Sequence, residues 1–197
     1  MNDLPDNEYE RIRDLYLTSV VIPTNKPEQQ SLLCPVGYIG AGKSTVTVPL
    51  AERLGFVRVS SDEIRKLLKE NNYTYARTKE MAAGIISEFL DGGYSVAIDA
   101  NCGSPEILDW IKEQGEKRFL KIFWIHVNPP EEFIVNKLRN YPHTWLFANG
   151  EQAVQNSLGR KKELGDLSNL VPYIYTFDTS KPNLSEQLKE AEALISK

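Results

Sequence analysis

Residues 37–45 read G-Y-I-G-A-G-K-S-T, which matches the pattern G-x-x-x-x-G-K-[ST] at every position. The glycines of such a turn carry no Cβ atoms, so successive backbone N–H groups are free to face a triphosphate. Lys43 adds a positive charge within reach of the β- and γ-phosphates, and Ser44 offers a hydroxyl to Mg²⁺. The stretch therefore predicts a strand–loop–helix unit that binds a nucleoside triphosphate with Mg²⁺.

The residues on either side of the loop supply that strand and that helix. Residues 31–36 (S-L-L-C-P-V) form an apolar run typical of a buried strand, although Pro35 is awkward in the centre of a sheet. After the loop, apolar side chains continue as far as Gly55, at Val46, Val48, Leu50 and Leu54. Pro49 falls about two turns into this helix and is expected to kink it or to mark its first turn. A glycine loop that matched by chance would leave both flanks unexplained.

Strand and helix patterns alternate along the rest of the chain. Further strands are predicted over residues 56–60, 94–99, 119–127 and 173–177. Helices are predicted over residues 62–70, 78–90, 104–115, 131–139, 151–164 and 184–195, with an irregular stretch at 140–150. Near-continuous apolar strands separated by helices indicate a five-stranded parallel sheet with helices on both faces, the α/β class of P-loop NTPases. The carboxyl ends of such strands meet at one edge, where the functional loops are expected.

The chain is expected to divide into an N-terminal helix with a linker, residues 1–30, and a P-loop domain, residues 31–197. An apolar stripe with helical spacing supports the helix, at Tyr9, Ile12, Tyr16 and Val20. Pro23 and Pro27 then mark the linker. The stripe is predicted to pack on the domain or on a second subunit, so a homo-oligomer stays open.

The composition limits the cellular locations and the classes of partner that are expected for the protein. The 197 residues, 41% hydrophobic and 25% charged, fit one globular domain. Without a run of 18 apolar residues or a secretory signal, no membrane partner is predicted, and the location is expected to be cytoplasmic. Cys34 and Cys102 lack metal-like spacing and are expected to be free thiols. The net charge of −4 argues weakly against binding long nucleic acid, though it leaves a local basic cleft possible.

Two acidic clusters follow predicted strands at the functional edge. In V-S-S-D-E-I-R, Asp62 and Arg65 lie one helical turn apart, so the carboxylate could accept a proton while the arginine holds a phosphate or that carboxylate. The alternative is an acid that favours a helix N-terminus and pairs with a surface arginine. In V-A-I-D-A-N, Asp99 ends a buried strand and is the expected partner of Mg²⁺ or its water, with Asn101 as an added polar contact. The alternative there is an ordinary Asp-x-Asn turn.

A third cluster is basic. It flanks the irregular stretch and comprises Lys137, Arg139, Arg160, Lys161 and Lys162. Mobile basic segments of this kind close over a transferring phosphoryl group in some enzymes, and the alternative is a solvated helix face.

Together, the P-loop, D-x-x-R, I-D-A-N and the later D-T-S (residues 178–180) resemble the P-loop kinases of the polynucleotide 5′-kinase type, whose relatives include small-molecule kinases and zeta-type toxins. The resemblance covers roughly residues 31–195. It implies that Lys43 and Ser44 hold ATP and Mg²⁺, that Asp62 is the general base, and that Arg65 helps to bind the acceptor. It places Asp99 at the acceptor or at a metal-bound water, and adenine near residues 179–182.

The expected sites follow from these observations. The nucleotide-binding residues are Gly37, Gly40, Ala41, Gly42, Lys43, Ser44, Thr45 and Thr179, with Ser44 and Asp99 at the metal. The catalytic residues are Lys43, Asp62, Arg65, Asp99, Arg139 and Arg160. Arg139 and Arg160 are the candidates for the lid, although the family usually carries two lid arginines closer together.

The predicted function is transfer of the γ-phosphoryl group of ATP to a hydroxyl on a small molecule or a nucleic-acid 5′ end, the latter less favoured by the net charge. Two alternatives remain open: an NTP hydrolase or switch, and a nucleotide-binding module without catalysis.

Overall fold

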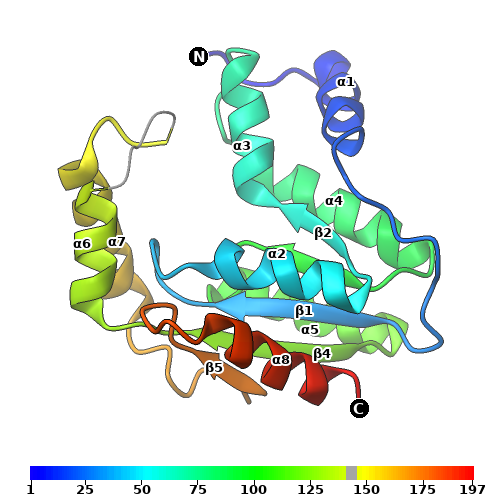
Figure 1. Ribbon diagram of the computed structural model, residues 1–197. Helices are drawn as coiled ribbons and strands as arrows, with labels where there is room; N and C mark the ends of the chain where they lie inside the picture. The colour runs from blue at the N-terminus through cyan, green and yellow to red at the C-terminus, as the bar shows by residue number, and fades with distance from the viewer. Residues whose placement is uncertain (141–145) are drawn as a thin grey trace.

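The computed structural model describes residues 1–140 and 146–197. One parallel sheet has the strand order β2–β3–β1–β4–β5 (Figure 1). Its strands are β1 (Ser31–Val36), β2 (Val57–Ser60), β3 (Val96–Asp99), β4 (Lys121–Val127) and β5 (Tyr175–Phe177). The predicted five-stranded parallel sheet is confirmed, and every strand ends at the residue predicted for it.

The helices also lie where the sequence places them. They are α1 (Asp6–Leu17), α2 (Lys43–Leu54), α3 (Ser61–Glu70), α4 (Thr78–Asp91), α5 (Pro105–Arg118), α6 (Glu131–Asn140), α7 (Gly150–Leu164) and α8 (Leu184–Ile195). The largest difference is in α5, which was expected to end near Gly115. That glycine instead lets the helix approach the sheet, because a Cβ there would lie 2.6 Å from Cδ1 of Ile122. Phe119, with φ of 55°, terminates the helix in the left-handed conformation.

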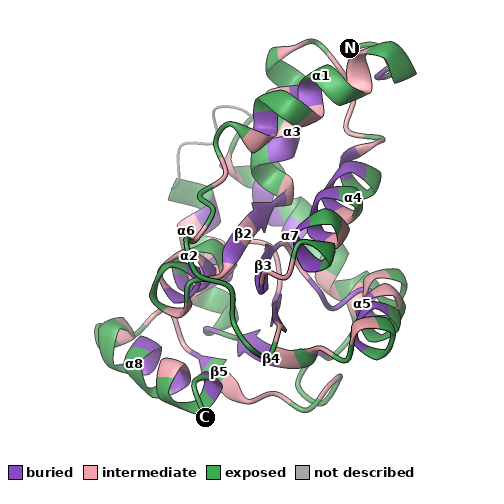
Figure 2. Cartoon of the chain, turned by 90° about the vertical axis from the view of Figure 1, so that its right-hand side faces the viewer, coloured by how far each residue is buried: buried purple, intermediate pink, exposed green. Residues whose placement is uncertain are grey.

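Alternate residues of β1 feed two separate cores. Leu32 and Cys34 belong to the core that contains the buried residues of α4 and α5, whereas Leu33 belongs to the core with α2 and α8. This division follows from the period of two in a strand, which sends successive side chains to opposite faces. Figure 2 shows the resulting pattern, with buried residues along the strands and on the helix faces turned toward them.

Both prolines that seemed out of place are accommodated. Pro35 lies beyond the last registered pair between β1 and β3, Leu33 with Ala97, and its carbonyl accepts a hydrogen bond from the Cys102 N–H at 2.9 Å. The pairing of β1 with β3 therefore ends before Pro35, so its missing N–H costs no hydrogen bond between these two strands. Pro49 lies inside the uninterrupted helix α2 rather than in its first turn, so the second of the two expectations for it is wrong.

The N-terminal helix packs on its own chain. Ile12 and Tyr16 of α1 are buried in the same core as β2, α3 and α4, and Arg13 forms an ion pair with Glu88 of α4. Val20 lies beyond the end of α1 at Leu17, so the apolar stripe is shorter than predicted. Across the described ranges, no helix is both long and apolar enough to pass through a lipid bilayer.

Candidate nucleotide and acceptor site

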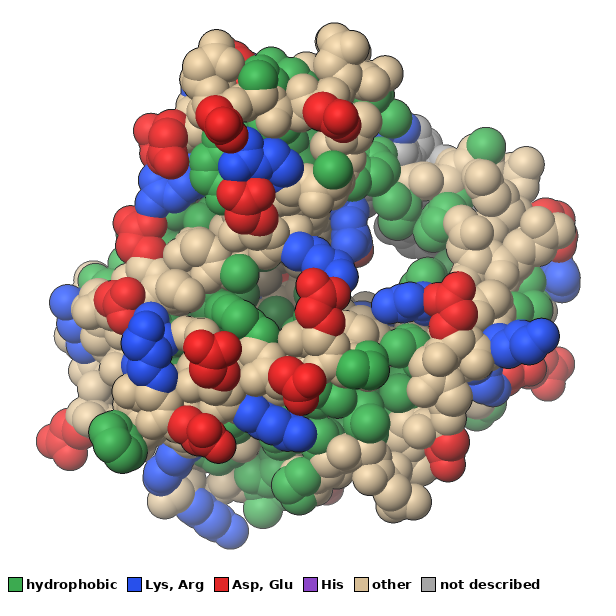
Figure 3. All heavy atoms as spheres, turned by 180° about the vertical axis from the view of Figure 1, so that it is seen from behind, with side chains coloured by type: hydrophobic (Ala, Val, Ile, Leu, Met, Phe, Trp, Pro, Cys, Tyr) green, Lys and Arg blue, Asp and Glu red, His purple; other side chains and the backbone are tan. Residues whose placement is uncertain are grey.

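A cleft of about 400 Å³ lies at the carboxyl edge of the sheet. It is lined by residues of the P-loop, of the starts of α3 and α5, and of α6 and α7, among them Gly37, Gly40, Gly42, Lys43, Ser44, Thr45, Asp62, Arg65, Asp99, Asn101, Lys137 and Arg160. Viewed from behind, the molecule is hollowed at its centre, with Lys and Arg side chains on the border of the hollow (Figure 3). Parallel strands bring these loops together because all their carboxyl ends face the same way.

The P-loop is fixed from both sides. Thr179, which follows β5, donates its hydroxyl to the carbonyl of Ala41 at 2.7 Å, and Ser157 of α7 donates to the carbonyl of Ile39 at 2.8 Å. Gly42 has φ of 95°, and a Cβ there would lie 3.1 Å from the Thr179 side chain, so only glycine fits without strain. Helix α2 begins at the next residue, so its unpaired N–H groups and positive dipole end face the position of an anion.

Lys43 is turned inward onto the loop. Its ammonium group donates to the carbonyls of Gly37 at 3.0 Å and Tyr38 at 2.9 Å. Burial lowers the pKa of Lys43 to about 8, although the negative charges of Asp62 and Asp99 oppose that shift. The side chain therefore remains mostly cationic at neutral pH, with carbonyl partners that it can exchange for phosphate oxygens.

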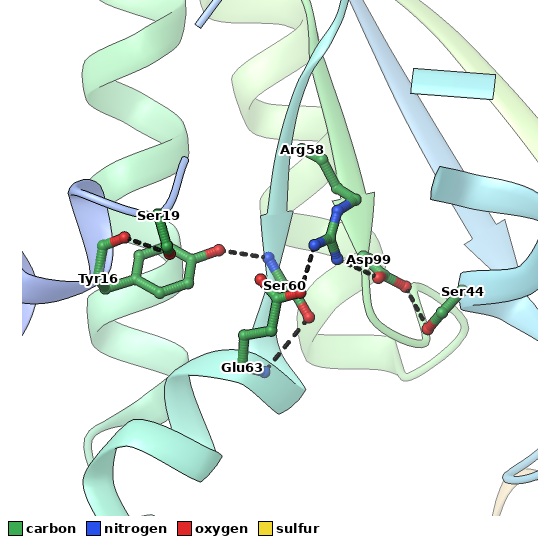
Figure 4. A network of polar contacts seen from close by, with 7 residues as sticks. All are labelled: Tyr16, Ser19, Ser44, Arg58, Ser60, Glu63 and Asp99. Atoms are coloured by element: carbon green, nitrogen blue, oxygen red, sulfur yellow. Dashed lines mark hydrogen bonds and ion pairs between the residues drawn. The ribbon is translucent and has the colours of Figure 1, made fainter. Parts of the chain in front are cut away.

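Asp99 of β3 belongs to a polar network that includes residues of α2, β2 and α3 (Figure 4). Its Oδ1 accepts a hydrogen bond from the Ser44 hydroxyl at 2.8 Å, and its Oδ2 accepts from Arg58 of β2 at 2.7 Å. Arg58 also pairs with Glu63 of α3. Burial raises the pKa of Asp99, while the hydrogen bonds from Ser44 and Arg58 and the charge of Arg58 act in the opposite direction.

Arg58 was not recognised in the sequence. The available signal was a charged residue within the apolar strand V-R-V, which needs a partner when half-buried. That partner comes from β3, the neighbouring strand, and its identity depends on the strand order.

The residues that were expected to hold Mg²⁺ are suitable in type. Asp99 and Ser44 offer a carboxylate and a hydroxyl oxygen 2.8 Å apart, and the Asp99 side chain is only 3% exposed. Mg²⁺ prefers oxygen ligands and usually keeps waters and substrate phosphates rather than a complete set of protein ligands. In the described ranges, no cluster of three His, Cys, Asp or Glu side chains could hold a metal by itself. The chemistry of these two groups fits a metal that is shared with a nucleotide.

Asp62 and Arg65 border the same cleft. Arg65 donates to Oδ1 of Asp62 at 2.7 Å, within the first turns of α3. The Asp62 side chain is 54% exposed, so its carboxylate remains accessible from the cleft. The local pair that was considered as a purely structural alternative is therefore present, but it lies at the cleft rather than on a remote surface.

The two lid candidates, Arg139 and Arg160, and Lys137 of the same basic cluster have different surroundings. Arg160 lines the cleft and donates to Glu163 at 2.7 Å, whereas Arg139 donates to Glu151 at 2.6 Å and is not among the cleft residues. Lys137 lines the cleft and has no hydrogen bond or ion pair within the described parts of the chain. Burial lowers its pKa, and its charge lowers the pKa of Lys43. Residues 141–145 of the predicted irregular stretch lie outside the described ranges.

Comparison with known families agrees with this geometry. Residues 32–144 match the model of a family described as the AAA domain. The chain belongs to that family. No curated protein sequence matches it.

Solved structures with the same fold include several kinases. A gluconokinase from Sinorhizobium meliloti 1021 is 20% identical, with 87% of this chain and 94% of that chain covered and a TM-score of 0.56. The Mycobacterium tuberculosis APS kinase in complex with AMPPNP and APS is 16% identical, with 87% and 100% covered and a TM-score of 0.55. The PezAT toxin–antitoxin system of Streptococcus pneumoniae is 13% identical, with 100% and 98% covered and a TM-score of 0.65. The AAA-domain chain therefore has the fold of the P-loop kinases.

Proposed function

We propose that this AAA-domain protein transfers the γ-phosphoryl group of ATP to a hydroxyl on a small molecule. One observation carries the proposal: the Asp62 carboxylate lines the same cleft as Lys43, Ser44 and Asp99. Asp99, the buried acid beside Ser44, is then available to a metal. Asp62 is a separate acid in the same cleft and is available to an acceptor.

In the proposed reaction, Asp62 accepts the proton of the acceptor hydroxyl as its oxygen attacks the γ-phosphorus, and ADP leaves with the electrons of the broken P–O bond. Arg65 keeps the Asp62 carboxylate oriented and offers its remaining N–H groups to the acceptor. Lys43 moves from the carbonyls of Gly37 and Tyr38 to the phosphates. Ser44 and Asp99 would hold Mg²⁺, which supplies charge neutralisation at the phosphates when bound.

Lys137 is the best candidate for the cation that stabilises the transferring group. The arginines chosen from the sequence each bond to a glutamate on the same or a neighbouring helix, so their charges are partly compensated. Lys137 lines the cleft without such a partner in the described ranges and lies near enough to Lys43 to lower its pKa. We therefore assign Arg160 a secondary role and Arg139 a structural one.

The acceptor class is inferred from the fold and the charge. The named neighbours with this fold include a gluconokinase and an APS kinase, which supports a small-molecule acceptor. The net charge of −4 gives little support to a nucleic-acid end. A nucleotide-binding module without catalysis remains one alternative, because both lid arginines chosen from the sequence pair with glutamates, and an NTP hydrolase or switch remains the other.

The test is transfer of label from [γ-³²P]ATP to sugars, nucleosides and 5′-OH oligonucleotides, by the wild type and by Asp62→Asn. The asparagine keeps the shape of the side chain but removes the base, so kcat should fall by about 10² to 10⁴ while the Kd for ATP stays within about twofold. Asp109→Asn, on the exposed side of α5, is the matched control and should leave both constants unchanged. Full phosphotransfer by Asp62→Asn would remove the general-base assignment, and release of inorganic phosphate with every acceptor would favour the hydrolase.

A further inference from the structure

We propose that Tyr16 of the N-terminal helix is a positioning residue for this site. Its hydroxyl holds the junction between β2 and α3, and that junction sets the place of Asp62. The inference rests on the proposed phosphotransfer, and it gives α1 a role that neither the P-loop motif nor the family match assigns.

The contact itself is direct and dry. The backbone N–H of Ser60 donates to the Tyr16 hydroxyl at 2.7 Å (Figure 4). Tyr16 is 2% exposed and Ser60 is 3% exposed, so water has little access to replace the bond. A buried N–H that loses its acceptor carries the full cost of its desolvation, and the local backbone then shifts to find another partner.

Ser60 immediately precedes α3 and caps its N-terminus. It is the last residue of β2 and the N-cap of α3, where its hydroxyl accepts from the Glu63 N–H at 3.3 Å. Asp62 follows two residues later, and its one hydrogen-bonding partner in the described ranges is Arg65 of the same helix. Because no described residue outside α3 forms a hydrogen bond with the Asp62 side chain, we expect its position to follow the start of the helix.

The junction between β2 and α3 is also connected to Asp99, the second acid of the site. Glu63, whose backbone N–H is capped by Ser60, pairs with Arg58, and Arg58 donates to Asp99 at 2.7 Å. A displaced helix start would therefore disturb the Arg58–Asp99 bond as well as Asp62. The nucleotide loop is linked to this junction through the Ser44–Asp99 bond, but its backbone carbonyls at Ala41 and Ile39 are held separately, by Thr179 and Ser157.

Helix α1 is held in place by contacts with the rest of the domain, so it can support the junction between β2 and α3. Ile12 is fully buried beside Tyr16 in the core, and Arg13 pairs with Glu88 of α4. The Tyr16 carbonyl also accepts the hydroxyl of Ser19 at 2.7 Å, which fixes the end of the helix. Tyr16 thus reaches the junction from a segment tied to two other parts of the domain.

Tyr16→Phe removes the hydroxyl and keeps the ring in the core. We expect kcat to fall by about tenfold to a hundredfold, since a base displaced by about 1 Å can cost about a hundredfold. The Kd for ATP should stay within about twofold of the wild type. Tyr9→Phe is the matched control: it lies on the same helix, and its hydroxyl forms no hydrogen bond within the described parts of the chain, so kcat should not change. Both variants are assayed well below their unfolding temperatures.

The outcomes separate the two proposals. A folded Tyr16→Phe protein with the kcat of the wild type overturns the positioning role, as does an equal loss in kcat and in ATP affinity, which would indicate general loosening. If the wild type phosphorylates no acceptor, the proposed function fails, and hydrogen exchange of the Ser60 amide then decides about the junction. Faster exchange in Tyr16→Phe than in Tyr9→Phe would support the coupling of α1 to α3; equal exchange would overturn it.

Discussion

The lowered pKa of Lys43 predicts that the affinity for ATP depends on pH in a defined direction. The ammonium group must be charged to bind phosphates, and burial lowers its pKa to about 8. Bound phosphates favour the charged form and raise that pKa, so binding takes up a proton wherever the free protein has lost it. ATP affinity should therefore be greatest below pH 8 and fall as the pH rises through 8.

The size of the effect follows from the fraction of Lys43 that is protonated. A group with a pKa of about 8 is about nine-tenths charged at pH 7 and about one-tenth charged at pH 9. The Kd for ATP should thus rise about tenfold between these pH values, which is about 1.4 kcal/mol of binding free energy. ATP is fully ionised over most of this range, so the nucleotide contributes little to the slope.

Isothermal titration calorimetry at pH 6.5 to 9.5 measures both the Kd and the proton uptake. Lys43→Arg is the control, because a guanidinium remains charged throughout and should give a nearly flat profile even if its affinity is lower. Lys137 also has a pKa lowered by burial, and its charge lowers the pKa of Lys43, so Lys137→Met should move the rise in Kd to higher pH without abolishing it. A wild-type Kd that does not change from pH 7 to 9, or a full slope that persists in Lys43→Arg, would refute the reasoning.

Two further predictions concern single side chains. Lys137→Met should lower kcat by about 10³-fold or more, within the range found for cations that stabilise a transferring phosphoryl group, whereas Arg139→Met should leave kcat within about twofold. Steady-state kinetics with saturating ATP compare the two variants. A larger loss of kcat in Arg139→Met than in Lys137→Met would restore the assignment made from the sequence. Thr47 of α2 is buried and its hydroxyl has no hydrogen-bonding partner in the described ranges, so Thr47→Val should raise the free energy of unfolding by about 1 kcal/mol. Urea denaturation measures that change, and a loss of stability would show that the hydroxyl has a partner after all.

Local sequence determined the fold class and the nucleotide loop. The loop pattern requires glycines at particular backbone conformations, and these requirements concern residues next to one another in the chain. The strands were located to their last residues because apolar runs and turn residues are also local signals. Where the boundaries differed, as at Gly115, a residue that usually ends helices was used for close packing against Ile122, a contact from a distant strand.

The composition of the site was decided by tertiary structure. Asp62, Asp99 and Arg160 were selected from the sequence, but their meeting in one cleft depends on the order of the strands and on the path of α7. Sequence analysis named Lys137 only as one member of a basic cluster, since nothing local distinguishes it from Arg139. The structure separates them, because one faces the cleft without a partner in the described ranges and the other pairs with Glu151.

The same reason explains the two residues whose roles were missed. Arg58 acquires its partner because β2 lies beside β3, and Tyr16 acquires its partner because α1 packs against the end of β2. Each bond joins residues about 40 positions apart, Arg58 with Asp99 and Tyr16 with Ser60. Periodicity and motifs report on what a short segment of chain requires, whereas such contacts arise only when separate segments bury their apolar faces against one another.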